Sequence, residues 1–322
     1  MDAAEIRERW RAAAPGWGEH GALVREMTAP VSAAMVDLGA PAGDERWLDV
    51  AVGVGDPAVN VARALGSGGL VVMSDAVVEM VQVTRRTVGA QASPPRLATV
   101  VAEAEAMPFA GSFDGLTCRF GAMFFADPPR ALASLRSTLA PGGRGVFAVW
   151  GERERNAFFG AVNEAVRGVV PDAPLPGPDD PHGFRYAVEG SLARLLDEAG
   201  WEDVEERRLP FSMASGLTPD RFWDHLTGLS VELAELAKKL PPDRVGALRD
   251  DIEARAARYF DGNRLSFPAE ARLVRARAPE RPARIPGGWG LPEKLHVQKE
   301  RRRRGRARDP GDRPDPERHP RA

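Results

Sequence analysis

Several features that would narrow the chemistry of this chain are rare or absent in its sequence. Cysteine occurs once, as Cys118, which excludes an intramolecular disulfide and any zinc site built from cysteines. No apolar run approaches the roughly 20 residues of a membrane-spanning helix. The first 17 residues lack the apolar centre of a secretory signal. We therefore expect no metal site, no membrane segment and a reducing, cytoplasmic environment.

The net charge of the chain is unevenly distributed, and only its last part is basic. The whole sequence has a formal net charge of −2 at pH 7. Residues 280–322 alone contain 13 lysines and arginines against 7 acidic residues, together with 7 prolines and 5 glycines. Such a segment buries too little apolar surface to offset its ordering entropy, so we predict a disordered basic tail over 279–322. The remaining body is acidic, which argues against a nucleic acid as partner.

Short apolar runs alternate with helical periodicity along the chain. The runs Arg46–Val52 and Leu70–Asp75 are typical of strands buried on both faces of a parallel sheet. Five further runs follow, at 97–102, 113–120, 145–150, 204–211 and 271–278. Because helical stretches separate most of these runs, the pattern predicts an α/β fold with a doubly wound, seven-stranded sheet.

Helical segments precede and interrupt the predicted sheet. Residues 1–45 carry apolar residues at helical spacing, punctuated by Pro15-Gly16 and Pro30, and are expected to form a cover of N-terminal helices. A second helical stretch lies between the last two strands, at about residues 212–268, and the family resemblance described below implies that it forms a substrate lid. The sheet and this insert together define a predicted domain at 46–278.

The segment LDVAVGVGDPAVNVAR joins the first strand to the next helix and predicts a ligand site. Gly53 and Gly55 let a ligand approach the backbone, and the free N–H groups of the helix capped by Asp56 point toward it. Asp75 ends the next strand, 20 residues after Gly55, where a carboxylate can accept hydrogen bonds from ribose hydroxyls. A cofactor that contains a nucleoside is expected. S-adenosylmethionine and NAD(P) fit equally, because Gly53–Ala58 also matches the GxGxxG/A pattern.

Four motifs further along favour the first of these cofactors. They are Met107-Pro108-Phe109, Ser112-Phe113-Asp114, Asp127-Pro128 and Leu139-Ala140-Pro141-Gly142-Gly143, the last forming a turn before the fifth strand. In order and spacing they resemble the class I S-adenosylmethionine-dependent methyltransferases. The branch of ubiquinone/menaquinone-biosynthesis and bacterial natural-product tailoring methyltransferases is most similar. The resemblance spans about residues 5–278 and implies a Rossmann-like fold and methyl transfer to oxygen or carbon of a small molecule.

The resemblance also implies which positions surround the cofactor. The glycine-rich loop would lie along its methionine part, Asp75 would hold the ribose, and Met80 would pack near the adenine. Glu103 would accept from the adenine amino group, whereas Arg119 and Phe120 would face the sulfonium and the acceptor. The implied set is Asp49, Ala51, Gly53, Gly55, Asp75, Met80, Glu103, Ala104, Arg119 and Phe120.

Two departures from the family pattern keep alternatives open. Ala51 stands where glycine is usual, and Val54 where a small hydroxyl residue or cysteine is common. A methyltransferase-like protein that binds the cofactor without transferring methyl is therefore one alternative, and an NAD(P)-dependent oxidoreductase is the other.

The acceptor site is less defined by the sequence than the cofactor site. No catalytic residue follows from the motifs, and His20 in the cover and His225 in the lid are the candidate general bases. Six aromatic residues are candidates for an acceptor pocket: Trp10, Trp17, Phe124, Phe125, Phe222 and Trp223.

Overall fold

A computed structural model describes residues 1–89, 96–171 and 180–280 of the chain. The predicted tail at 279–322 lies outside the described residues beyond its first two positions. Among the helices of the described part, none has both the length and the apolarity to cross a membrane.

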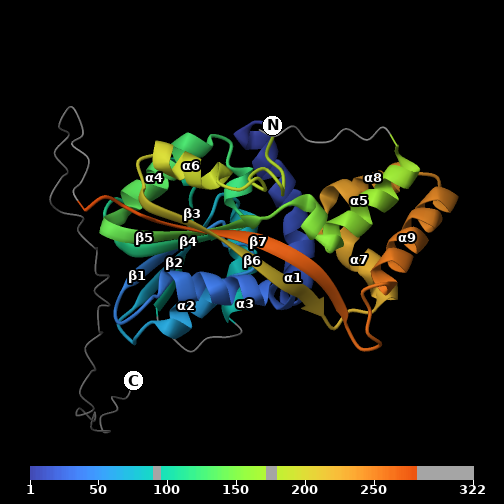
Figure 1. Cartoon of the computed structure of the whole chain (residues 1–322), viewed down its shortest axis with the longest axis horizontal. Helices are drawn as coiled ribbons and strands as arrows, with labels where there is room; N and C mark the ends of the chain where they lie inside the picture. Colours follow the sequence, from blue (N-terminus) through green and yellow to red (C-terminus); the bar gives the residue numbers. More distant parts are fainter. Residues whose placement is uncertain (90–95, 172–179, 281–322) are drawn as a thin grey trace, which may run out of the picture. The chain divides into compact units, whose positions relative to one another are not determined.

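Within the described residues, seven strands form one sheet in the order β3-β2-β1-β4-β5-β7-β6 (Figure 1). Their bounds are β1 Arg46–Val50, β2 Leu70–Asp75, β3 Arg96–Val101, β4 Phe113–Arg119, β5 Leu139–Trp150, β6 Glu202–Ser215 and β7 Leu265–Arg277. β1 to β5 are parallel, whereas β7 runs antiparallel to both β5 and β6. The predicted doubly wound, seven-stranded sheet is confirmed. Its strand order reverses between β1 and β4, where ligands bind in folds of this class.

Helices cover both faces of this sheet. They are α1 Ala3–Gly39, α2 Ala58–Ala64, α3 Val78–Gly89, α4 Pro128–Thr138 and α6 Ser191–Glu198. Figure 1 shows α4 and α6 on the face opposite to α2 and α3. The alternation of side chains along β5 explains both layers: Val146 packs with Val31 and Met35 of α1, whereas Phe147 joins the core under α4 and α6.

Helix α1 is continuous from Ala3 to Gly39 and contains both Pro15 and Pro30. It begins with a capping box, in which Asp2 accepts from the backbone N–H of Glu5 and Glu5 accepts from that of Asp2. Each internal proline removes one backbone hydrogen bond, but α1 buries residues along its whole length, and this packing offsets the loss. The predicted interruptions are therefore wrong.

The Pro-Gly-Gly motif lies within β5 and does not form a separate turn. Phe113 pairs with Leu139, and the register then shifts so that Gly115 pairs with Arg144. The motif thus forms a bulge, which Gly142 permits with a φ of +73°. The expected start of the fifth strand at residue 145 is corrected to Leu139.

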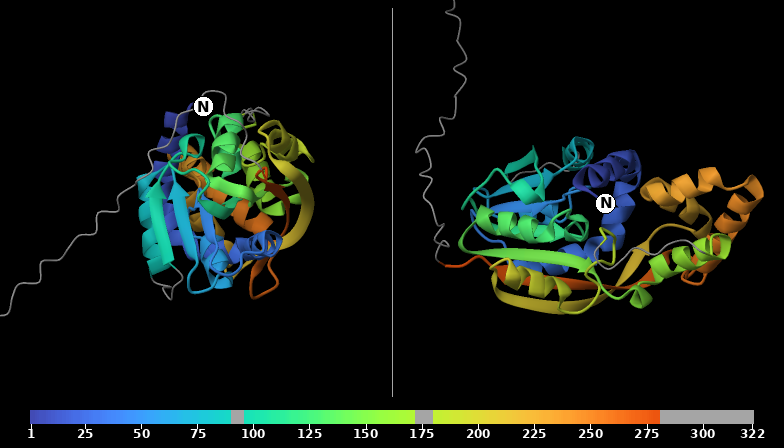
Figure 2. Two further views of the ribbon diagram at one scale, coloured as in Figure 1. Left: turned by 90° about the vertical axis from the view of Figure 1, so that its left-hand side faces the viewer. Right: turned by 90° about the horizontal axis from the view of Figure 1, so that it is seen from above.

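Four helices gather at one end of the β6–β7 hairpin (Figures 1 and 2). Three lie between β6 and β7, within the predicted insert: α7 Pro219–Leu229, α8 Val231–Lys239 and α9 Pro242–Ala257. The fourth, α5 Ala157–Val169, follows β5 instead. Phe158 of α5 meets Phe222 of α7 and Phe267 of β7 edge to face, at ring-centroid distances of 5.3 and 5.5 Å. Two separate chain segments therefore build this helical group.

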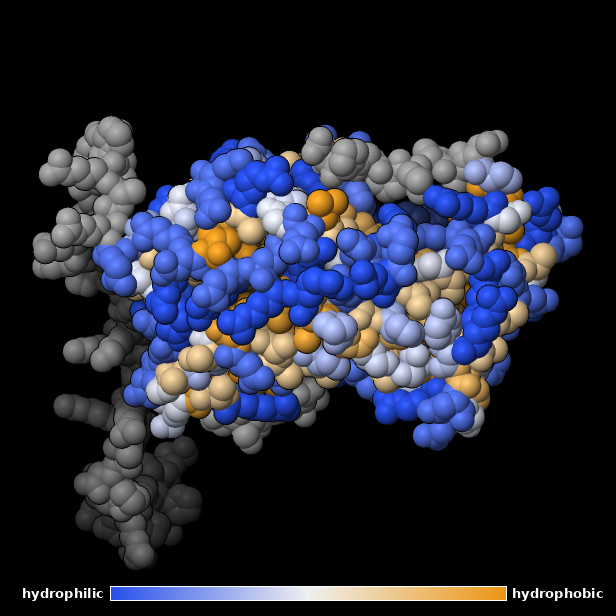
Figure 3. All heavy atoms as spheres, in the orientation of Figure 1, coloured by the Kyte–Doolittle hydropathy of each residue, from blue (hydrophilic) through white to orange (hydrophobic). Residues whose placement is uncertain are grey.

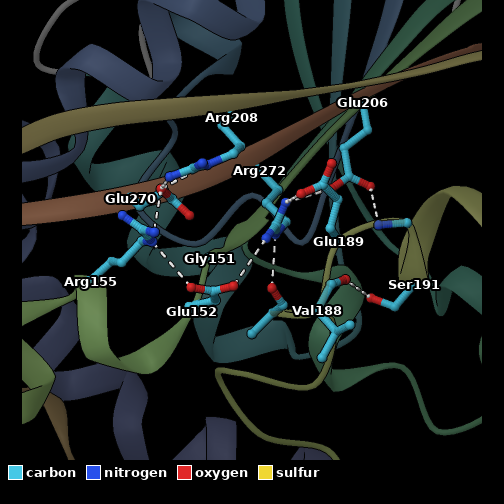
Figure 4. Close-up of polar contacts among 12 residues, drawn as sticks. Gly151, Glu152, Arg155, Val188, Glu189, Ser191, Glu206, Arg208, Glu270 and Arg272 are labelled. Carbon is cyan, nitrogen blue, oxygen red and sulfur yellow. Dashed lines mark hydrogen bonds and ion pairs between the residues drawn. The ribbon is translucent and has the colours of Figure 1, made fainter.

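Charged side chains cover β6, the edge strand of the sheet. Figure 3 shows a band of hydrophilic side chains across the β6–β7 hairpin, an arrangement that discourages pairing with another chain. Two charged residues of β7 are buried below the band. Arg272 pairs with Glu206 at 3.0 Å and donates to the carbonyl oxygen of Ala187 at 2.8 Å, while Glu270 pairs with Arg208 at 2.6 Å (Figure 4). The network binds the loop before α6 to the sheet.

Candidate active site

A cavity of about 470 Å³ opens at the carboxyl ends of β1 to β4 and continues under α5, α7 and α8. Side chains of α1 complete its wall. Its volume is in the usual range for small-molecule sites. Eight of the ten expected cofactor positions line it: Ala51, Gly53, Asp75, Met80, Glu103, Ala104, Arg119 and Phe120.

The glycine-rich loop presents its backbone to this cavity. Gly53 has a φ of +52°, a region that glycine enters without steric cost. Its N–H donates to Asp75 at 3.4 Å, and its carbonyl oxygen accepts from the hydroxyl of Thr84 at 2.7 Å. The ring of Trp17 from α1 lies 3.6 Å from where a Cβ would stand on Gly53. A side chain here would therefore occupy space between the loop and Trp17.

The two departures from the family pattern have partners elsewhere in the chain. Ala51 has a φ of +54°, which is costly for any residue with a Cβ. A Cβ on Gly121 would lie 2.4 Å from the Cβ of Ala51, so Gly121 leaves the space that the extra methyl needs. Val54 is buried against Gly21 of α1. Both substitutions therefore fit the local packing of this chain.

Asp75 lies at the end of β2 on the wall of the cavity. Its Oδ1 accepts from the N–H of Val77 at 3.0 Å and its Oδ2 accepts from Gly53. Burial raises the pKa of Asp75 to about 6, and these backbone donors oppose that shift. At neutral pH the carboxylate is mostly ionised and can accept further hydrogen bonds from a ligand.

Asp49 and Gly55, the other two expected positions, lie behind the cavity wall. Asp49 accepts from the hydroxyl of Thr117 at 2.6 Å and from the N–H of Ala58 at 3.2 Å. Burial raises the pKa of Asp49 to about 7. A Cβ on Gly55 would lie 2.5 Å from Val88 of α3. Both residues hold the loop in place from its protein side.

Arg119 is buried at the end of β4 and is paired within the protein. It forms an ion pair with Asp56 at 3.0 Å, donates to Ser32 at 2.9 Å and also donates to Thr28. Burial lowers the pKa of Arg119. The prediction that Asp56 caps α2 is wrong, because its carboxylate is engaged by Arg119 and Ser32 while α2 begins at Ala58 without a side-chain cap.

Three arginines tie α1 to the rim of the cavity. Arg7 pairs with Glu103, which lies just after β3. Arg9 pairs with Glu232 of α8 at 2.5 Å, and Arg11 pairs with Glu79 of α3 at 3.4 Å. These six side chains are partly exposed, so salt screens each pair. The sequence contained no local signal for these contacts.

Aromatic side chains form much of the cavity wall. Phe120, with a φ of +59°, stacks on Trp150 with ring centroids 4.0 Å apart and planes at 8°. Phe159 meets Trp150 edge to face at 5.0 Å. Of the six expected aromatic residues, Trp10, Trp17, Phe124 and Phe125 line the cavity. Three lining aromatics were missed: Trp150, Phe158 and Phe159. Only Trp150 had a signal, its place at the carboxyl end of a predicted strand.

The two candidate histidines meet where α1 crosses α7. The crossing is close, since a Cβ on Gly16 would lie 1.6 Å from the carbonyl oxygen of Gly228. The rings of His20 and His225 pack edge to face with centroids 5.0 Å apart. His225 lines the cavity and is buried, whereas His20 is half-buried and does not line it. Burial lowers the pKa of His225 to about 4, so its ring is neutral at pH 7.

Comparisons with known proteins identify the family of the chain. The model of the ubiE/COQ5 methyltransferase family matches residues 31–215. The ubiquinone/menaquinone biosynthesis C-methyltransferase of Dinoroseobacter shibae is 31% identical over 191 residues, covering 56% of this chain and 76% of that one. The enzyme of the same name from Pectobacterium carotovorum is 36% identical over 173 residues, covering 50% and 68%.

A solved structure agrees with this assignment at the level of the fold. The YcgJ protein of Bacillus subtilis matches with a TM-score of 0.50 and 17% identity, covering 78% of this chain and 98% of that chain. The alternative of an NAD(P)-dependent oxidoreductase is set aside by the family match. This chain belongs to the ubiE/COQ5 methyltransferase family and is a methyltransferase that uses S-adenosylmethionine.

Proposed function

We propose that this enzyme methylates an aromatic small molecule of the quinol type, at a ring carbon beside a hydroxyl group. The observation that carries the proposal is one cavity with two unlike ends. One end presents the Gly53 backbone and the Asp75 carboxylate beside the ring of Trp17, and the other presents the stacked rings of Phe120 and Trp150. The relatives from Dinoroseobacter and Pectobacterium are named as C-methyltransferases of quinone biosynthesis, which supports carbon as the acceptor atom.

The first end fits S-adenosylmethionine by its donors and acceptors. Asp75 would accept from the ribose hydroxyls, and the open backbone at Gly53 would lie along the methionine part. The indole N–H of Trp17 is buried without a hydrogen-bond partner among the described residues and lies above this loop, so it could donate to the bound molecule. Glu103 would accept from the adenine amino group while it remains beside Arg7.

Three further expected positions complete this end of the site. Ala104 and Met80 are buried apolar residues and would pack against the adenine. Ala51 would lie beside the methionine part. Asp49 and Gly55 would act from behind the wall, by fixing the conformation of the loop.

The second end would bind and orient the acceptor. S-adenosylmethionine supplies an electrophilic methyl group on a sulfonium. Because positive charge disperses as such a methyl moves, the protein contributes mainly alignment and exclusion of water. Phe120 and Trp150 offer flat apolar faces for an aromatic ring. The helices α5, α7 and α8 would act as the acceptor lid, and α1 as the cover of the cofactor.

Mass spectrometry of reaction mixtures tests the proposal. The purified enzyme would be incubated with methyl-deuterated S-adenosylmethionine and a panel of 1,4-dihydroxynaphthalene, 1-naphthol and 1-methylnaphthalene under reducing conditions. We expect one labelled methyl on the ring carbon of the hydroxylated compounds and none on 1-methylnaphthalene. Binding of the cofactor without labelled product from any hydroxylated compound would contradict the proposal and favour a protein that binds without transfer.

A further inference from the structure

His225 combines burial, a place on the cavity wall and two unused ring nitrogens. It lies on α7 and is 1% exposed. Neither Nδ1 nor Nε2 has a hydrogen-bond partner among the described residues. The side chain lines the cavity together with Leu226 and Leu229 of the same helix. A neutral imidazole has one donor and one acceptor, so two hydrogen bonds are available to a molecule in the cavity.

A purely structural role does not account for this residue. Buried polar atoms are hydrogen-bonded in most folded proteins, because an unpartnered atom loses its hydrogen bonds to water and gains none within the protein. The contact with His20 is edge to face between rings and is available to any aromatic side chain. An apolar residue of similar size would pack in this place without the penalty. The unpartnered ring nitrogens of His225 therefore point to a hydrogen-bond partner that a bound ligand supplies.

The position of His225 suggests which ligand this is. It lies outside residues 31–215, which match the family model, as do the other residues of α7 and α8. The lining residues near it on these helices are Leu226, Leu229 and Leu233, with Ser230 between them. Asp75 and the glycine-rich loop belong to the matched part. A hydrogen-bonding group that lies outside the matched part and is set in an apolar wall suits recognition of the acceptor.

We propose that His225 binds the hydroxyl group of the aromatic acceptor through a neutral hydrogen bond and thereby selects hydroxylated rings. The inference rests on the proposed function, because it places the acceptor at the aromatic end of the cavity. The χ2 torsion of histidine has broad, two-fold wells, so a turn of the ring can present either nitrogen to the hydroxyl. His225 acts here as a binding and orienting group.

The electrostatics of the site argue against full proton transfer to this ring. Burial and the neighbouring charge of His20 lower the pKa of His225 to about 4, so an imidazolium is strongly disfavoured. A hydrogen bond from the acceptor hydroxyl leaves the imidazole neutral. It still raises electron density on the hydroxyl oxygen and, by resonance, on the ring carbon ortho to it, which is the atom proposed to receive the methyl in exchange for its hydrogen.

Binding of two matched probes tests this assignment. The enzyme would be saturated with S-adenosylhomocysteine and titrated in a calorimeter with 1-naphthol or with 1-methylnaphthalene, which lacks the hydroxyl. We expect the wild type to bind 1-naphthol about 5- to 10-fold more tightly than 1-methylnaphthalene. His225→Leu should abolish that difference, and His225→Gln, whose amide can still donate and accept, should retain part of it. The affinity for S-adenosylhomocysteine should change by less than about 2-fold in both variants.

Thermal unfolding separates this role from a structural one. Since His225→Leu removes unpartnered polar atoms from a buried site, we expect its Tm to rise by about 2 °C or more without ligand. A histidine needed for packing would give a lower Tm instead. His20→Leu makes the matched change on the neighbouring ring, which does not line the cavity, and should keep the preference for 1-naphthol.

The outcomes distinguish the two proposals. An unchanged preference for 1-naphthol in His225→Leu would overturn the assignment of His225. Equal loss in His20→Leu would also overturn it, since the helix crossing would then be responsible. Failure of the wild type to bind 1-naphthol would remove the acceptor class on which the inference rests. Failure to bind S-adenosylhomocysteine would contradict the proposed function itself.

Discussion

At the residue scale, two carboxylates on adjacent strands have different tasks because they face different surroundings. Asp75 of β2 faces the cavity and accepts from the backbone N–H of Gly53 in the glycine-rich loop and from that of Val77 just after β2. Asp49 of β1 faces Thr117 and the first residue of α2. Burial raises the pKa of both groups, to about 6 and about 7. Only Asp75 is placed to contact a ligand, so Asp49 is expected to influence stability.

Substitution of Asp49 should change how stability depends on pH. The unfolded chain releases the Asp49 proton near its ordinary pKa of 3.8, whereas the folded protein holds it up to about pH 7. The folded state therefore binds more protons between these values, and the stability that this group contributes is lost as pH rises through 7. Asparagine has no proton that titrates in this range. Its amide oxygen can accept from the N–H of Ala58, and its amide N–H can donate to Thr117 once the Thr117 hydroxyl rotates to accept.

The unfolding free energy of Asp49→Asn relative to the wild type should therefore rise by about 3 kcal/mol when the pH is raised from 5 to 8. Urea denaturation at both pH values measures the difference. An equal difference at pH 5 and pH 8 would show that Asp49 is already ionised in the folded protein.

The pair Ala51 and Gly121 gives a second residue-scale prediction. Ala51→Gly removes a Cβ from a left-handed backbone and should stabilise the protein by about 0.5–1 kcal/mol. Gly121→Ala should cost about 1–3 kcal/mol, because its Cβ would meet that of Ala51 at 2.4 Å. In the double variant the cost of Gly121→Ala should largely disappear. Strictly additive effects in denaturant titrations would argue that the two positions do not compete for the same space.

At the element scale, α1 links the cofactor end of the cavity to the acceptor end. Its arginines reach the end of β3, α3 and α8, and its Gly16 crosses α7 beside the two histidines. The helix was expected as several pieces, because Pro15 and Pro30 are strong local signals. Its continuity comes from packing against elements far away in the sequence, which no local pattern reports.

Gly16→Ala tests the importance of the α1–α7 crossing. The added Cβ would lie 1.6 Å from a backbone oxygen of Gly228, so the two helices must separate. We expect a loss of about 2–3 kcal/mol in unfolding free energy, together with weaker binding of S-adenosylhomocysteine. Gly160→Ala in α5 is the control, since a Cβ there meets nothing within 4 Å and should stabilise the helix by about 1 kcal/mol. Similar stability of both variants would contradict the close crossing.

At the scale of the whole molecule, the order of the strands and helices was predictable, and the contacts between distant segments were not. The strands, the loop at Gly53 and the place of Asp75 follow from periodicity and from the rule that parallel strands end at one edge. The orientation of Asp49, the ion pair of Arg119 with Asp56 and the meeting of His20 with His225 depend on contacts between distant segments. The sequence marked both histidines but could not reveal that they touch.

The central claim is that the cavity binds S-adenosylmethionine through an ionised Asp75. The pKa of Asp75 is about 6, so at pH 5 about nine-tenths of the carboxyl groups are protonated and cannot accept from both ribose hydroxyls. Calorimetric titration with S-adenosylhomocysteine at pH 7.5 and pH 5, on the wild type and Asp75→Asn, measures this directly. The account predicts about 10-fold weaker binding by the wild type at pH 5, and weaker but pH-independent binding by Asp75→Asn. Equal affinities for the two proteins at pH 7.5 would contradict it.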